Sequence, residues 1–301
     1  MKNYGLIGYP LAHSFSPAYF KEKFQREGLA DYRYEAFPLS AIELLLELLE
    51  QHPDLWGFNV TIPYKEQIIP YLDEIDEAAA EIGAVNCVKI VRGKDIGRTR
   101  CVPTSGCEKK YFLKGYNTDA PAFAHCLQEG WGLLNKKVSR TGKAVKALVF
   151  GTGGAAKAVA YALRQLHIDF YFVSRHNRDE QTITYHDLEH ALLNKNLQGD
   201  NLQNNNFKND NALNDSIINR KNLLKDCKLW INTTPVGMYP HVEESLPLDF
   251  SVIGSEHYLF DLIYNPEETV FLRQGRSHGA HTQNGLAMLH EQAELSWNLF
   301  Q

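Results

Sequence analysis

Cysteine is scarce in this sequence, and no Cys-x-x-Cys pair of the kind that binds zinc occurs. Five cysteines in 301 residues are a small and odd number, which argues against a disulfide framework. Cys101 and Cys107 are interpreted as free thiols in a loop. The pattern His186-Asp-Leu-Glu189-His190 matches the HxxEH of some zinc peptidases, but no third ligand is evident, so we expect no metal site.

Long apolar runs and an excess of basic charge are also missing. No stretch approaches the roughly 20 unbroken apolar residues of a membrane-spanning helix, and the polar start lacks the basic-then-apolar plan of a signal peptide. Lys and Arg number 31 against 36 Asp and Glu, which gives a net charge of −5. Such a surface has no general attraction for nucleic acid or an anionic membrane. We therefore expect a cytoplasmic protein with neither as a partner.

The length and the apolar pattern predict two α/β domains. The chain is about twice a usual domain length of roughly 150 residues. Apolar and β-branched runs predict strands at 4–8, 33–37, 56–61, 84–91, 145–150, 169–173, 229–233 and 258–262. Segments of helical period separate them. This alternation predicts mainly parallel sheets that are covered on both faces.

Local signals predict where several helices begin. Ser16 before Pro17 predicts an N-cap, and Ser40 with Glu43 predicts a capping box for a helix that ends near Gln51. Further helices are predicted at 120–129 and 286–300, the latter from apolar residues at 286, 289, 293 and 297. We interpret 94–114 as a loop. Nine Asn between 194 and 215 predict a surface insertion.

A glycine-rich turn follows the strand predicted at 145–150. Gly151, Gly153 and Gly154, with Ala156 as a further small residue, precede a helix that runs to about Leu166. Glycines at such a turn allow backbone N–H groups to approach a pyrophosphate closely. The pattern predicts a dinucleotide site, and a turn that needs its glycines only for packing is the alternative.

The end of the next predicted strand indicates which dinucleotide is bound. It reads Ser174-Arg175-His176 and lacks the carboxylate that usually accepts a hydrogen bond from the ribose of NAD. A guanidinium can pair with a 2′-phosphate in a forked geometry. NADP is therefore favoured over NAD, and a solvated arginine at the strand end is the alternative.

Polar residues follow the predicted strands of the first half, where open α/β sheets place ligands. They are Ser14, Ser16, Asn59, Thr61, Lys65, Asn86 and Asn117 to Asp119. Hydroxyls, amides, one amine and one carboxylate suit a polyhydroxylated acid. Local alternatives stay open, since Ser16 and Asp119 could each cap a helix and Asn86 could lie in a turn.

An ordered series of motifs resembles the shikimate dehydrogenase family. The motifs are Ser14-x-Ser16, Asn59-Val-Thr-x-Pro-x-Lys65, Gly83-Ala-Val-Asn86, Gly115-Tyr-Asn-Thr-Asp119, Gly151-x-Gly-Gly-Ala155, Asn232-Thr-Thr-Pro235, Asp261-Leu-Ile-Tyr264-x-Pro and Asn284-Gly-Leu-x-Met-Leu-x-x-Gln292. They cover nearly the whole chain except 94–113 and 190–226. A series in family order is more specific than any of its members.

The resemblance implies an N-terminal α/β substrate domain plus a Rossmann-type NADP-binding domain. The substrate-binding and catalytic domain would be discontinuous, at 1–119 plus 286–301, and the NADP-binding domain would span 120–285 with the Asn-rich insertion at about 194–215. The implied reaction is the reversible NADPH-dependent reduction of 3-dehydroshikimate to shikimate, in chorismate and aromatic amino acid biosynthesis. The expected partner is this small molecule, and the chain is expected to be a monomer or a homodimer.

The resemblance also implies a role for individual residues. Lys65 and Asp119 would be the catalytic pair. The substrate would be held by Ser14, Ser16, Thr61, Asn86, Asp119, Tyr264 and Gln292. The cofactor would be contacted by Gly151, Thr152, Gly153, Gly154, Ala155, Ser174, Arg175, Leu262 and Gly285. Hydride transfer to a ketone leaves negative charge on its oxygen, so Lys65 is expected to donate a proton there and Asp119 to orient it.

Two departures from the family pattern leave alternatives open. Cys87 stands where the family often has Thr, and Ser174-Arg175-His176 departs from the usual Asn-Arg-Thr. One alternative is a quinate/shikimate dehydrogenase with wider substrate choice or NAD use. A non-catalytic nucleotide-binding regulatory protein is the other, and the retention of Lys65 with Asp119 speaks against it.

Overall fold

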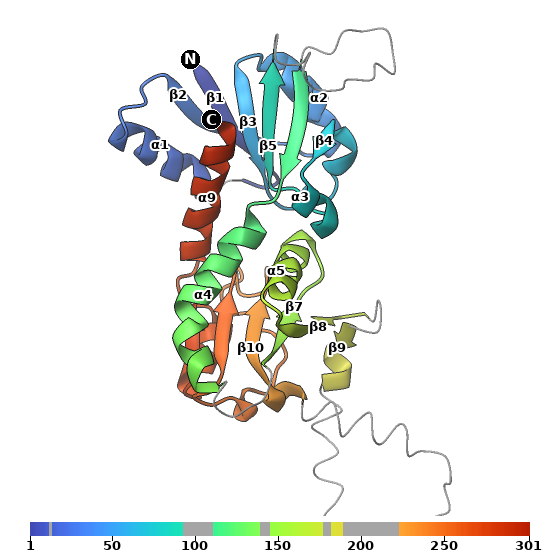
Figure 1. The fold of residues 1–301 in the computed structure, drawn as a ribbon, viewed down its shortest axis with the longest axis vertical. Helices are drawn as coiled ribbons and strands as arrows, with labels where there is room; N and C mark the ends of the chain where they lie inside the picture. The colour runs from blue at the N-terminus through green and yellow to red at the C-terminus, as the bar shows by residue number, and fades with distance from the viewer. Residues whose placement is uncertain (12–13, 93–110, 139–144, 177–181, 189–222) are drawn as a thin grey trace, which may run out of the picture. The chain divides into compact units, whose positions relative to one another are not determined.

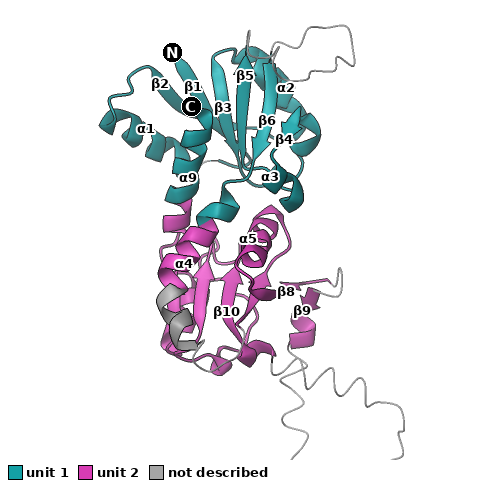
Figure 2. Ribbon diagram, in the orientation of Figure 1, with its two compact units in different colours: residues 1–122, 290–301 teal, residues 123–289 magenta. Residues whose placement is uncertain are grey.

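The chain folds into two compact units. The structure, a computed structural model, describes residues 1–11, 14–92, 111–138, 145–176, 182–188 and 223–301, with 132–138 as backbone only (Figure 1). Unit 1 consists of residues 1–122 and 290–301, and unit 2 of residues 123–289 (Figure 2). The predicted Asn-rich insertion, Cys101, Cys107 and the Glu189 and His190 of the HxxEH pattern lie outside the described residues.

Unit 1 is built on a mixed six-stranded sheet. Its strands are β1 (Lys2–Gly8), β2 (Tyr32–Pro38), β3 (Leu55–Val60), β4 (Glu74–Ile75), β5 (Cys87–Arg92) and β6 (Tyr111–Tyr116), in the order β2-β1-β3-β5-β6-β4. β1 is parallel to β2 and β3, whereas β5 is antiparallel to β3 and β6. The prediction of a loop through residue 114 is wrong for β6, because Phe112, Leu113 and Gly115 are buried and all six residues of β5 pair with this segment.

The helices of unit 1 begin differently from the predictions. They are α1 (Ser16–Arg26), the 3₁₀ turns η1 (Ile42–Leu44) and η2 (Ile69–Tyr71), α2 (Leu45–Gln51) and α3 (Glu77–Ile82). Phe15, not Ser16, holds the N-cap position of α1, and no side chain caps it. The predicted capping box is also wrong, since Ala41 is extended and a 3₁₀ turn precedes α2.

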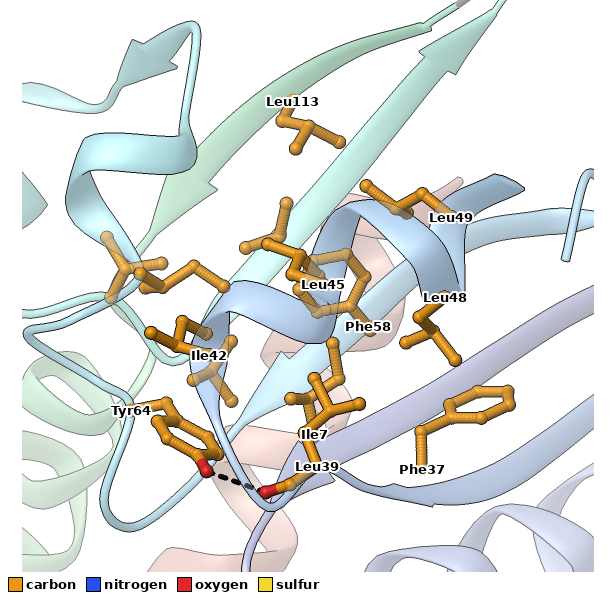
Figure 3. Packing of buried hydrophobic residues seen from close by; sticks show 14 of the residues in the cluster. Ile7, Phe37, Leu39, Ile42, Leu45, Leu48, Leu49, Phe58, Tyr64 and Leu113 are labelled. Atoms are coloured by element: carbon orange, nitrogen blue, oxygen red, sulfur yellow. Dashed lines mark hydrogen bonds between the residues drawn. The ribbon is translucent and has the colours of Figure 1, made fainter. Parts of the chain in front are cut away.

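Two apolar layers cover the sheet of unit 1. Helix α2 turns Leu45, Leu48 and Leu49 into a cluster with Ile7 of β1 and Phe58 of β3 (Figure 3). Full burial of one such side chain stabilises the fold by roughly 1.5–3 kcal/mol. The second cluster joins β1 to α1 and to α9 (Leu286–Phe300), through Tyr4, Phe20, Phe24, Trp297 and Phe300. The end of the chain thus forms part of the core of unit 1.

Unit 2 is built on a parallel six-stranded sheet. Its strands are β7 (Lys146–Phe150), β8 (Asp169–Ser174), β9 (Thr182–Thr184), β10 (Cys227–Asn232), β11 (Tyr258–Asp261) and β12 (His281–Gln283), in the order β12-β11-β10-β7-β8-β9. Every neighbouring pair is parallel. The strand order reverses between β7 and β10, which is where such sheets bind ligands.

The helical elements of unit 2 are α5 (Gly154–Gln165), η5 (Phe250–Val252) and α8 (Val270–Ser277). The boundaries between the units fall within two helices, α4 (Asp119–Val138) and α9. The core of unit 2 centres on Phe150, Trp230, Leu259 and Phe271. Within the described segments, no helix combines the length and the apolar character that crossing a membrane requires.

Candidate functional site

Lys65 and Asp119 form a buried ion pair in unit 1. Lys65 Nζ donates a hydrogen bond to Asp119 Oδ2 at 2.6 Å, and the two side chains are 16% and 3% exposed. Val85 N donates to the carbonyl of Lys65 at 2.7 Å, which ties this turn to the approach of β5. A charge-assisted bond in such a low-dielectric setting fixes the ammonium in one direction.

Asp119 does not have to cap α4, so its carboxylate can pair with Lys65. Asn117 Oδ1 accepts a hydrogen bond from Ala120 N at 3.1 Å, so Asn117 provides the cap. The alternative that Asp119 itself caps the helix is therefore wrong. Asp119 lies in the first turn instead, where the positive end of the helix favours a carboxylate.

Asn86 connects this pair's neighbourhood to α9. Its Oδ1 accepts from Thr118 N at 2.7 Å, and its Nδ2 donates to Thr118 Oγ1 at 3.0 Å and to Gln292 Oε1 at 3.1 Å. Two residues that the family resemblance assigns to the substrate, Asn86 and Gln292, are therefore in direct contact. Thr118, between them and next to Asp119, was quoted in a motif but given no role.

A second amide, Asn59, extends the same network. Its Nδ2 donates to the carbonyl of Asn86 at 3.1 Å and to Ser296 Oγ at 2.7 Å, and its Oδ1 accepts from the hydroxyl of Tyr34 at 2.8 Å. Burial raises the pKa of Tyr34 well above its usual value, and a hydrogen bond from Ser16 opposes this shift. Ser16 thus bonds to Tyr34 rather than capping α1.

The remaining predicted substrate residues lie on both units. Ser14 and Thr61 are half-buried in loops that follow β1 and β3. Thr61 N donates to the carbonyl of Ile7 at 2.9 Å, which holds this loop against β1. Tyr264 is half-buried in unit 2, three residues after β11 ends.

The glycine-rich turn of unit 2 connects β7 to α5. Gly151 has φ +110°, and a Cβ on it would lie 2.6 Å from Thr233 Oγ1, so only glycine fits there without strain. Gly153 is the N-cap of α5, and nothing lies within 4 Å of a Cβ built on it. Gly154 and Ala155 open the helix, with Thr152 half-buried before it. This open helix N-terminus fits a pyrophosphate.

A buried polar cluster supports the loops beside this turn. Asn232 Nδ2 and Ile263 N both donate to Asp261 Oδ1 at 3.0 Å, and Thr269 Oγ1 donates to Asp261 Oδ2 at 2.6 Å. Burial raises the pKa of Asp261 from 3.8 to about 6. Asn232 and Asp261 were quoted as motif members without this role, and a polar residue that ends an apolar strand is the signal for both. Thr269 was in no motif.

The other residues predicted to contact a cofactor lie at strand ends of the same sheet. Leu262 N donates to the carbonyl of Asn232 at 3.0 Å, and a Cβ on Gly285 would lie 2.1 Å from the carbonyl oxygen of Leu262. Ser174 ends β8, and the next residue, Arg175, is exposed. No group of three or more His, Cys, Asp or Glu among the described residues is arranged to hold a metal ion.

The fold and these two clusters define a class of protein. A parallel sheet with a glycine turn at its point of strand reversal is the architecture of dinucleotide-binding α/β domains. A separate unit that carries a buried Lys–Asp pair among amides and hydroxyls provides acid–base groups. Together they describe a two-unit α/β dehydrogenase, and the predicted α/β fold class with a Rossmann-type domain is confirmed.

Comparison with known proteins gives the family. The family model of the shikimate dehydrogenase substrate binding domain matches residues 6–88. The shikimate dehydrogenase (NADP(+)) of Methanosphaera stadtmanae is 34% identical over 298 residues, which cover 98% of this chain and 90% of that protein. The chain belongs to the shikimate dehydrogenase family, as the motifs predicted.

Solved structures agree with this assignment. Shikimate dehydrogenase 1 from Peptoclostridium difficile superposes with a TM-score of 0.70 at 32% identity, covering 100% of this chain and 92% of that one. The shikimate 5-dehydrogenase of Thermus thermophilus, solved in complex with NADP(H) and shikimate, gives a TM-score of 0.66 at 28% identity, covering 100% and 94%. These likenesses extend over both units.

Proposed function

We propose that this chain catalyses the reversible NADPH-dependent reduction of 3-dehydroshikimate to shikimate, a step of chorismate and aromatic amino acid biosynthesis. The observation that carries the proposal is the buried pair of Lys65 and Asp119, joined at 2.6 Å. Asp119 directly follows Thr118, which bonds to Asn86. Membership of the family supports the same reaction.

Lys65 acts as the proton donor. NADPH, when bound, supplies a hydride to the carbonyl carbon of the substrate. Negative charge then develops on the carbonyl oxygen, and the Lys65 ammonium stabilises it and gives it a proton. Asp119 holds the ammonium in place through its charge-assisted hydrogen bond. In the reverse direction Lys65 takes the proton from the hydroxyl of shikimate.

The substrate is held by hydroxyl and amide groups. Asn86 and Gln292, which bond to each other at 3.1 Å, present amides suited to the hydroxyls of the substrate. Ser14, Ser16 and Thr61 add hydroxyl groups from the loops after β1 and β3. These assignments, and that of Tyr264, rest on the family resemblance.

The cofactor is NADP, held by unit 2. The glycine turn at Gly151, Gly153 and Gly154 fits the pyrophosphate, because the backbone is open at the N-terminus of α5. The exposed guanidinium of Arg175, at the end of β8, suits the 2′-phosphate. We thus assign the cofactor to unit 2 and most substrate contacts to unit 1. We further propose a cytoplasmic monomer or homodimer without a nucleic-acid partner.

The test is an oxidation assay that crosses shikimate and quinate with NADP and NAD. The proposal expects the highest kcat/KM for shikimate with NADP, followed through the absorbance of the reduced nicotinamide. Comparable turnover of quinate, or preference for NAD, would assign the chain to the quinate/shikimate dehydrogenases. If no pair of substrate and cofactor yields reduced nicotinamide, the chain would instead be a non-catalytic nucleotide-binding protein.

A further inference from the structure

Ser296 is a polar residue buried in the apolar face of α9. It is 0% exposed and stands one helical turn after Gln292, between the core residues Ala293 and Trp297. Buried hydroxyls in a core are costly unless every hydrogen-bonding group is satisfied. The hydrogen-bond partners of Ser296 therefore indicate its role.

Polar groups from four segments meet at the Ser296 hydroxyl, and one of them is the thiol of Cys87 on β5. Ser296 Oγ donates to the carbonyl of Gln292 at 2.8 Å and accepts from Asn59 Nδ2 at 2.7 Å. Thr118 Oγ1 lies at 3.2 Å. A hydroxyl has one proton and two acceptor sites. With its proton on the carbonyl of Gln292, Ser296 accepts from both Asn59 and Thr118.

The same reasoning assigns the direction of the next bond. Thr118 Oγ1 donates to Ser296, with Asn86 Oδ1 at 3.3 Å as a second acceptor, and it accepts from Asn86 Nδ2 at 3.0 Å. The second proton of that Nδ2 goes to Gln292 Oε1 at 3.1 Å. Asn86, Thr118, Ser296 and Gln292 are thus linked in a ring, in which Ser296 bonds to the backbone carbonyl of Gln292 and Asn86 bonds to its side-chain oxygen.

We propose that Ser296 is a positioning residue for the substrate amides. It does not touch the substrate, since it is fully buried, but it holds Thr118, which orients the Asn86 amide, and Asn86 in turn holds the side-chain oxygen of Gln292. This inference rests on the proposed function, which assigns these two amides to substrate binding. Removal of the hydroxyl leaves one proton of Asn59 Nδ2 without its acceptor and turns the Thr118 hydroxyl toward Asn86 Oδ1, 3.3 Å away, so the Asn86 amide is held differently.

Ser296→Ala tests the proposal in steady-state assays of shikimate oxidation with NADP. We expect the KM for shikimate to rise about fivefold, which corresponds to about 1 kcal/mol, the net worth of one hydrogen bond. We expect kcat to change less than the KM for shikimate, and the KM for NADP to stay unchanged. A merely structural serine would lower Tm without altering the KM for shikimate.

Arg92→Met is the matched control for lost stability in unit 1. Arg92 Nε donates to the carbonyl of Leu55 at 3.1 Å, at the start of β3 and away from the polar ring. This variant is expected to lower Tm and leave both KM values unchanged. Thr118→Val breaks the same ring at Thr118 and is expected to raise the KM for shikimate as Ser296→Ala does. This second variant keeps the test valid if Ser296→Ala does not fold.

The outcomes separate the two proposals. If the unaltered protein does not oxidise shikimate, the proposed function fails. If it does, and the KM for shikimate is unchanged in every folded variant of Ser296 and Thr118, the positioning role is refuted. An equal rise in the KM for NADP would also refute it, because unit 2 contributes nothing to this ring.

Discussion

Three consecutive residues at the start of α4 have different tasks. Asn117 caps the helix, Thr118 joins the polar ring, and Asp119 pairs with Lys65. A carboxylate that also had to accept from the backbone would hold the ammonium less firmly, because its lone pairs would be shared. In the motif Gly115-Tyr-Asn-Thr-Asp119, each of the last three side chains therefore has its own hydrogen-bond partner.

Lys65→Ala tests the residue at the centre of the proposed chemistry. We expect kcat to fall by roughly 10²–10⁴, the usual contribution of a positioned general acid, while shikimate binding stays largely intact. Stopped-flow turnover and equilibrium binding of shikimate measure the two effects. Lys114→Ala, which removes an ion pair with Glu74, is the control. Near-normal turnover without Lys65 would eliminate its assignment.

Asp261 makes the stability of the protein depend on pH. Burial raises its pKa from 3.8 to about 6, so the folded chain binds a proton more readily than the unfolded chain. The contribution of this group to stability therefore rises as pH falls through about 6 and is complete below about 4. Relative to Asp261→Asn, the unaltered protein should gain at most about 3 kcal/mol between pH 7 and pH 4.

Urea denaturation at several pH values checks this prediction. The difference in the free energy of unfolding between the unaltered protein and Asp261→Asn isolates the group from other titrations. The exposed Asp169→Asn serves as the control. A difference that stays constant from pH 7 to pH 5 would contradict the assigned cause.

At the scale of elements, the glycine turn offers a matched pair of variants. Gly151→Ala places a methyl group 2.6 Å from Thr233 Oγ1 at φ +110°, so it should lower Tm. Gly153→Ala meets nothing within 4 Å, so Tm should change by no more than about 4 °C. If the pyrophosphate approaches Gly153 closely, its alanine variant should still raise the KM for NADP by about tenfold.

Thermal unfolding and NADP titration distinguish these effects. An unchanged KM for NADP in Gly153→Ala would mean that the turn carries its glycines for packing alone. Equal losses of Tm in both variants would instead contradict the geometry of the turn.

Sequence patterns predicted some elements well because a single physical signal defines them. Strands β7 and β10 each contain a short unbroken apolar run, at 147–150 and 229–231, as expected of strands buried on both faces. β6 was missed since it adjoins a polar stretch that masked its short apolar segment. The capping signals at Ser16 and Ser40 failed for different reasons. The Ser16 hydroxyl bonds to Tyr34, and the residue after Ser40, Ala41, is extended and precedes a 3₁₀ turn.

The site was predictable in part for a similar reason. The motifs predicted that Lys65 and Asp119 act as a pair, and the two side chains are in contact in the structure. Their catalytic role stays a prediction. The pattern at 286, 289, 293 and 297 counted apolar positions only. It therefore included Leu286, which is 40% exposed, and passed over Ser296, which is fully buried. Long-range partners such as Asn59 decide such positions, and no local pattern contains them.

At the scale of the whole molecule, unit 1 depends on residues from both ends of the chain. The ring of Trp297 lies 5.5 Å from that of Tyr4 and 5.1 Å from that of Phe24. Glu294 Oε2 pairs with the buried Lys23 Nζ at 2.7 Å. These contacts join α9 to β1 and α1.

Trp297→Ala tests this dependence. We expect it to lower the free energy of unfolding by about 3–5 kcal/mol, the usual cost of removing a buried aromatic ring. Hydrogen exchange should quicken in β1, β2 and α1 and not in the strands of unit 2. Phe271→Ala, in the core of unit 2, should give the opposite distribution. Faster exchange in both units with either variant would show that they do not unfold separately.

The return of the chain to unit 1 has a consequence for protein synthesis. The ribosome makes residues 290–301 after every residue of unit 2. Until they emerge, the aromatic face of the first sheet lacks Trp297 and Phe300, and Asn86 lacks Gln292. Unit 2 has its whole sequence available earlier. A nascent chain can therefore contain all of unit 2 before Gln292 and Ser296, which belong to the polar ring of unit 1, have been made.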